Sequence, residues 1–137
     1  PRSLSYYALG KYKEAIADFD KVIPLGPLPK FYETRAKSFE KLGKYKEAIS
    51  DYNTLIKTDP KVIKNYVGRG RNYLALGKTK EAIADANHAI KIGPRFRDAF
   101  KFRAEIYRKI GNNAAADADQ KKYNQMMKLY VEPKDFE

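Results

Sequence analysis

Residues 42–60 read LGKYKEAISDYNTLIKTDP, and residues 9–27 (LGKYKEAIADFDKVIPLGP) and 76–94 (LGKTKEAIADANHAIKIGP) repeat the same pattern. Each copy has glycine as its second residue, and a fourth glycine follows at the same spacing. These are Gly10, Gly43, Gly77 and Gly111, at intervals of 33, 34 and 34 residues. A fixed period near 34 indicates a row of stacked units that cannot bury their apolar faces alone. The repeat favours a binding surface and gives no support to a catalytic site.

Within each unit, apolar and small residues follow two helical stripes. With the glycine numbered as position 15, positions 4, 8 and 11 share one helical face, and positions 20, 24, 27 and 28 share another. The glycine ends the first helix, and a proline at position 32 ends the second. The sequence therefore predicts antiparallel pairs of helices, each about 12–15 residues long. The first helix should be short, about Ser3 to Leu9, with seven full helices after it, and Pro24 should end one of these near Ile23.

This pattern resembles the tetratricopeptide repeat family, and the match runs from Arg2 to about Tyr130. The resemblance implies an all-α fold, a right-handed superhelical α-solenoid of about four units whose first helices line a concave groove. It also implies a module that binds peptides or helices of partner proteins and seldom has catalytic activity of its own. We expect one domain, residues 1–137, with a partial unit at 1–28, units at 29–62 and 63–96, a unit with a C-terminal capping helix at 97–130, and a tail at 131–137.

The composition excludes several kinds of site. The 137 residues include no cysteine and one histidine, His88, so neither a disulfide nor a thiolate metal site can form. No apolar stretch is long enough to cross a bilayer. We therefore expect no enzyme, no cofactor, no metal and no membrane span. The chain starts at Pro1 rather than methionine, which we interpret as a processed or trimmed end; a cytoplasmic protein is slightly favoured, and an exported one stays open.

A pair of opposite charges recurs in every unit. Position 7 holds Arg2, Arg35, Arg69 and Arg103, and position 23 holds Asp18, Asp51, Asp85 and Asp119. A guanidinium can bind a carboxylate through two parallel hydrogen bonds, so such a pair can fix the register of two helices. We interpret the recurrence as a structural ion pair, either within one unit or to the next, in preference to a ligand-binding role.

The net charge of +11 lies on the first helices of the units, because the charges of the second helices and their flanks balance. Residues 61–76 contain four bases and no acid. An excess of this kind favours an acidic partner. The side chains expected to line the groove are the bases Lys37, Lys64, Arg71, Lys101 and Arg108 and the apolar anchors Val67, Leu74 and Phe102. We expect this face to bind an acidic or amphipathic peptide segment; the alternative is an ordinary solvated surface.

Two further functions stay open from the sequence. The array could associate with a second copy of itself, or its basic face could bind nucleic acid or phosphate groups. Binding of chaperone tails is not expected. The resemblance to the family implies that such tails are bound by a two-carboxylate clamp of Lys, Asn and Arg side chains at fixed positions of the repeat. In this chain only Lys64 matches one of those positions.

Overall fold

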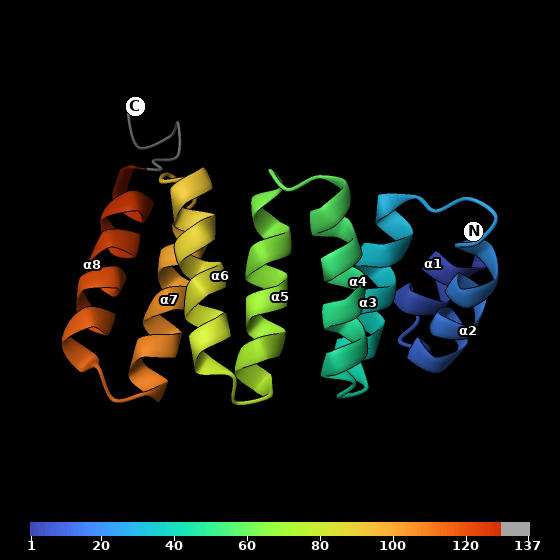
Figure 1. The fold of residues 1–137 in the computed structure, drawn as a ribbon, viewed down its shortest axis with the longest axis horizontal. Helices are drawn as coiled ribbons and strands as arrows, with labels where there is room; N and C mark the ends of the chain where they lie inside the picture. Colours follow the sequence, from blue (N-terminus) through green and yellow to red (C-terminus); the bar gives the residue numbers. More distant parts are fainter. Residues whose placement is uncertain (130–137) are drawn as a thin grey trace, which may run out of the picture.

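The computed structural model describes residues 1–129, where it contains eight α-helices and no β-strand. In Figure 1 the helices stand side by side along the long axis of the molecule, from α1 and α2 at one end to α8 at the other. Their bounds are α1 (Arg2–Ala8), α2 (Tyr12–Val22), α3 (Pro29–Lys41), α4 (Tyr45–Thr58), α5 (Ile63–Ala75), α6 (Thr79–Ile92), α7 (Arg97–Lys109) and α8 (Asn113–Leu129). The all-α solenoid of helix pairs expected from the sequence is confirmed.

Two details of the helix bounds follow from the sequence. The first helix is short, and α2 ends at Val22, so Pro24 lies just beyond it as expected. The expected tail at residues 131–137 lies outside the described residues. No helix within residues 1–129 is both long and apolar enough to cross a membrane.

The four repeated glycines form the turn inside each helix pair. Each has a positive φ, between +73° and +85°, a conformation that costs energy for any residue with a Cβ atom. At Gly43 the glycine N–H donates to the Glu40 carbonyl at 3.0 Å, and the next N–H, of Lys44, donates to the Phe39 carbonyl at 2.8 Å. These two bonds are a Schellman motif, which satisfies carbonyls at the end of the helix. The same two bonds recur at all four glycines, so the repeated glycine of the sequence corresponds to the same turn in each helix pair.

Small residues let the two helices of a pair approach closely. Ala15, Ala48, Ala82 and Ala116 occupy one position of the four second helices, and all are fully buried. Large apolar side chains fill the remaining space, and the largest fully buried ones are Phe19, Phe102 and Ile106. Within residues 1–129 the buried apolar side chains form three clusters along the array rather than one central core. Stability therefore comes from each pair and its immediate neighbours.

The first helices of successive pairs approach one another on one side of the array. Each pair packs on the next through α2 with α3, α4 with α5 and α6 with α7, and in addition α1 contacts α3 and α5 contacts α7. Side chains also join α3 to α5, because Lys64 binds Glu33 and the Nδ2 of Asn72 donates to Glu40 at 2.7 Å. We call the surface that α3, α5 and α7 form on this side the inner face.

Candidate peptide-binding face

Each position-7 arginine binds the aspartate sixteen residues later, on the second helix of its own pair. The Nε of Arg35 donates to Asp51 at 2.9 Å, and its Nη2 donates to the other carboxylate oxygen at 2.6 Å. Arg2 with Asp18, Arg69 with Asp85 and Arg103 with Asp119 show the same two bonds. Both oxygens of each carboxylate are therefore engaged, which fixes the position of one helix against the other.

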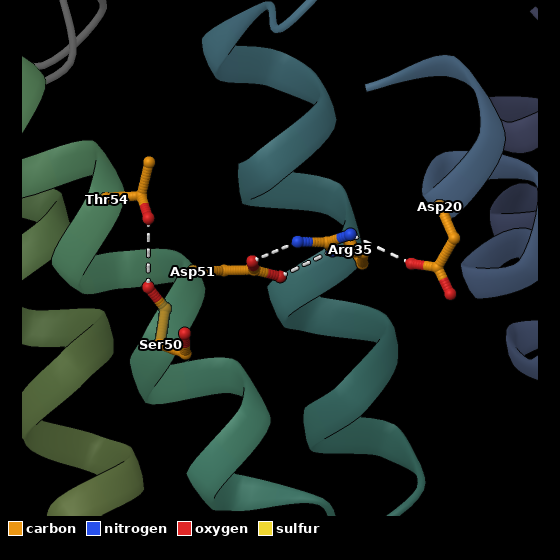
Figure 2. Close-up of polar contacts among 5 residues, drawn as sticks. All are labelled: Asp20, Arg35, Ser50, Asp51 and Thr54. Carbon is orange, nitrogen blue, oxygen red and sulfur yellow. Dashed lines mark hydrogen bonds and ion pairs between the residues drawn. The ribbon is translucent and has the colours of Figure 1, made fainter. Parts of the chain in front are cut away.

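The arginine also reaches back to the preceding helix pair. The remaining nitrogen, Nη1 of Arg35, donates to Asp20 of α2 at 2.8 Å, so its side chain lies between α4 and α2 (Figure 2). Arg69 donates to Asn53 and Arg103 to Asn87 in the same way, at 3.0 and 2.9 Å. The sequence left open whether the arginine–aspartate pair lies within a unit or between units. The structure has each pair within one unit, and the contact to the preceding unit goes to a different acceptor.

Aromatic rings surround the same guanidinium groups. The Arg35 guanidinium lies 5.7 Å from the ring centroid of Tyr32 and 5.9 Å from that of Phe39, distances at which a cation is attracted to an aromatic face. Hydrogen bonding to Asp51 raises the pKa of Arg35. The donors of Arg35, Arg69 and Arg103 are committed inside the array, so these three contribute little to a site for an external ligand. Arg2 differs, because 68% of its side chain is exposed.

The bases expected to face a ligand are accessible, and most of them already bind an acid. The Nζ atoms of Lys37 and Lys64 both donate to Glu33, at 3.2 and 3.1 Å. Arg71 donates to Glu105 at 3.1 Å, and Arg108 donates to Asp117 at 3.0 Å. Lys101 has its Nζ 5.5 Å from the ring centroid of Tyr123. The side chains of Lys37, Lys64, Arg71 and Arg108 remain 44–61% exposed. The structure brings Lys37 and Lys64 together on one carboxylate and places Arg71 and Arg108 on separate ones.

Two of the three expected apolar anchors are wrong, because the structure buries them. Phe102 is fully buried and Val67 is 9% exposed, and both belong to the core cluster of α5, α6 and α7. Phe102 fills the space next to Gly70, where an added Cβ atom would lie 2.7 Å from the ring. The guanidinium of Arg71 covers it at 4.9 Å from the ring centroid. Leu74 is half-buried and packs against the same cluster.

A small hollow opens between α3, α4 and α5 on the inner face. Its volume is about 90 Å³, and its lining residues are Glu33, Lys37, Tyr52, Lys64 and Asn65. Burial raises the pKa of Glu33, but the hydrogen bonds from Lys64 and Lys37 outweigh burial and hold the pKa below its usual value. Glu33 is therefore a carboxylate at neutral pH. Burial also raises the pKa of Tyr52, and the charge of Glu40 adds to the effect.

Sequence reasoning missed Asn65. The residue is 5% exposed, and within residues 1–129 its side-chain amide makes no hydrogen bond. A signal was available, because the equivalent positions of the neighbouring units are Phe31 and Ala99. At this position the other units have an apolar side chain that packs on its neighbours, whereas the Asn65 amide can also bind a polar group.

Comparisons with known proteins agree with this architecture. Family models described as tetratricopeptide repeat match residues 2–25, 29–62 and 67–121. A search of curated protein sequences gave no match. Within residues 1–129, no group of three or more His, Cys, Asp or Glu side chains could hold a metal ion.

Solved structures show the same fold at low sequence identity. A MamA structure from Desulfovibrio magneticus RS-1, comprising residues from 41 to the end, superimposes with a TM-score of 0.88 at 18% identity, covering 95% of this chain and 74% of that one. A thermophilic tetratricopeptide repeat protein of Thermus thermophilus gives a TM-score of 0.76 at 24% identity, covering 90% of this chain and 70% of that one. At these identities the likeness shows the fold alone.

Proposed function

The chain belongs to the tetratricopeptide repeat family, a family of protein-interaction scaffolds, and we propose that it binds an acidic segment of a partner protein on its inner face. The proposal is non-enzymatic: the partner is bound, without being changed. The bases Lys37, Lys64, Arg71, Lys101 and Arg108 would attract and orient that segment.

The observation that supports the proposal is the placement of charge. The inner face is built from the first helices α3, α5 and α7, which together carry +8 of the net charge of +11. Attraction between a basic face and an acidic segment raises the association rate and suppresses wrong partners more than it raises affinity. An amphipathic segment with large apolar anchors is a weaker candidate, because Val67 and Phe102 are buried.

The test is a double charge reversal with a matched control. We expect Arg71→Glu with Lys101→Glu to weaken binding of a fluorescein-labelled peptide of glutamate pairs separated by leucines by about tenfold or more, measured by fluorescence anisotropy. Lys80→Glu with Lys91→Glu changes the net charge equally, but on exposed positions of α6. This control should bind within about twofold of the wild type. Equal losses in both variants would mean a general charge effect, and unchanged binding in the first would exclude the inner face.

The same peptide assay separates the other candidate functions. Displacement by heparin and by generic DNA, with affinity that falls steeply as salt rises, would favour a nucleic-acid or phosphate ligand. A molar mass that rises with protein concentration in light scattering would favour self-association. Preference for a chaperone-tail peptide over the glutamate peptide would contradict our interpretation of the clamp positions.

A further inference from the structure

The carboxylate of Glu33 lies where two cations from successive units meet. Lys37, one helical turn along α3, donates to Oε1 at 3.2 Å, and Lys64 at the start of α5 donates to Oε2 at 3.1 Å. The Glu33 side chain is 15% exposed, whereas those of Lys37 and Lys64 are 44% and 61% exposed. Two ammonium groups share one carboxylate, so these three side chains carry one net positive charge, and a further acid at the hollow is Glu40, which acts on Tyr52.

Asn65 is a second and independent sign of a binding site. It lines the hollow beside these lysines, only 5% of it is exposed, and its side-chain amide has no partner within residues 1–129. Within residues 1–129 the fully enclosed side-chain atoms without a partner are Ser3 Oγ and Asn72 Oδ1, so the Asn65 amide is not enclosed and faces the open hollow. An amide that lines a hollow next to two ammonium groups can donate Nδ2–H to an oxygen that enters the hollow.

The size and charge of the hollow limit what can enter. A volume of about 90 Å³ has room for a carboxylate group together with ordered water. A phosphate dianion would bring two negative charges next to Glu33, where the two lysines leave only one to be neutralised. The site therefore favours a single negative charge.

We propose that Lys37, Lys64 and Asn65 form a subsite for one aspartate or glutamate side chain of the bound segment, and that Glu33 competes with that side chain for the two lysines. The inference rests on the proposed function and adds to it a position and an internal competitor. In the free protein Glu33 holds both ammonium groups in place. On binding, the incoming carboxylate accepts a hydrogen bond from Asn65 and hydrogen bonds from the two lysines. The free energy gained is then small, because the lysine contacts with the ligand replace similar contacts with Glu33. Glu33 would thereby set how acidic a partner must be.

The decisive experiment measures the affinity of the glutamate–leucine peptide for two single variants whose substitutions change the net charge equally. Glu33→Gln removes the competitor, and Glu81→Gln removes an exposed acid from the first turn of α6, outside the inner face. We expect Glu33→Gln to tighten binding by about threefold to tenfold and Glu81→Gln by less than about twofold. Equal effects, or no effect of Glu33→Gln, would overturn the inference.

Asn65 provides a readout that does not depend on charge. In the wild type, adding the glutamate peptide should shift the Asn65 side-chain amide resonance, and a matched glutamine peptide should not. Asn65→Leu, checked for folding by circular dichroism, should weaken the glutamate peptide about threefold to tenfold. An unmoved Asn65 resonance at saturation would overturn the inference.

The outcomes separate this inference from the proposed function. If the Arg71 and Lys101 double variant loses the peptide while Glu33→Gln behaves as wild type, the basic inner face binds and the subsite is wrong. If no variant and no wild type binds the glutamate peptide, both proposals fall. If a phosphoserine peptide binds the wild type more tightly than the glutamate peptide, the argument for a single negative charge is wrong.

Discussion

Replacing Asp51 with alanine tests whether the repeated arginine–aspartate pair stabilises the array or binds a ligand. The Asp51 side chain is 4% exposed and that of Arg35 is 19% exposed, and two hydrogen bonds of 2.6 and 2.9 Å join them. The substitution leaves a largely buried guanidinium with one remaining carboxylate, Asp20 of the preceding pair, at 2.8 Å. We expect the free energy of unfolding to fall while peptide affinity stays unchanged.

The magnitude follows from these contacts. Removing one partner of a fully buried ion pair costs about 3–5 kcal/mol, because the other charge stays buried without compensation. Asp20 and the partial exposure of Arg35 offset part of that cost, so we expect a loss of about 2–3 kcal/mol for Asp51→Ala. In a domain of this size such a loss lowers the melting temperature by about 10 °C.

Asp20→Ala is the matched control, because it removes the other carboxylate from the same guanidinium. Its side chain is 56% exposed and accepts a single hydrogen bond, so the expected loss is about 0.5 kcal/mol. Urea unfolding followed by far-ultraviolet circular dichroism gives both values, and the slope shows whether the array still unfolds as one unit. Equal losses in the two variants would refute the reasoning from burial. A stable Asp51→Ala protein without peptide binding would assign the pair to the ligand.

Two further predictions concern packing and pH. Gly70→Val should lower the free energy of unfolding by about 2 kcal/mol in the same urea assay, because its Cβ would collide with the buried Phe102 ring. Gly26→Ala, with no atom within 4 Å of the added Cβ, should change it little, and equal effects would contradict the packing argument. Acidification should also reduce stability: a carboxylate such as Glu33, whose pKa is lower in the folded state, stabilises the fold above its unfolded pKa of about 4.3 and loses that contribution as the pH falls through the folded value. Glu33→Gln should therefore flatten the stability profile in acid, and an unchanged profile would exclude this role.

The helix pairs could be predicted from the sequence because their signals are local. The helix ends where the Gly43 N–H donates to the carbonyl three residues before it and the Lys44 N–H donates to the carbonyl five residues before it. Ala48 packs where any larger side chain would keep the helices apart. The arginine–aspartate contact could be anticipated because both residues recur at one period. The sequence analysis did not predict the second acceptor of these arginines, which lies in the preceding unit and is Asp20 for Arg35. A carboxylate or amide recurs at that position, as Asp20, Asn53 and Asn87.

The burial of Phe102 could not be predicted from its position in the repeat. That position faces the groove when each unit is considered alone. Its ring is buried because Gly70, in the preceding unit, leaves space for it and Arg71 covers it. The burial of Phe102 therefore depends on residues of the preceding unit. Assigning each residue to a face from its own position in the repeat does not predict it.

The acids Glu33 and Glu105 on the inner face affect which ligands the proposed binding face would prefer. Lys64 and Arg71 already bind Glu33 and Glu105, so a partner's carboxylate exchanges one ion pair for another instead of neutralising a free charge. Each exchange yields a small net free energy, as for other exposed pairs. A single anion would therefore bind weakly, whereas a segment with several carboxylates along the array would add its small gains at one entropic cost of association. If the proposed function holds, we expect this face to bind extended acidic segments in preference to isolated anions, even though the net charge of the chain is +11.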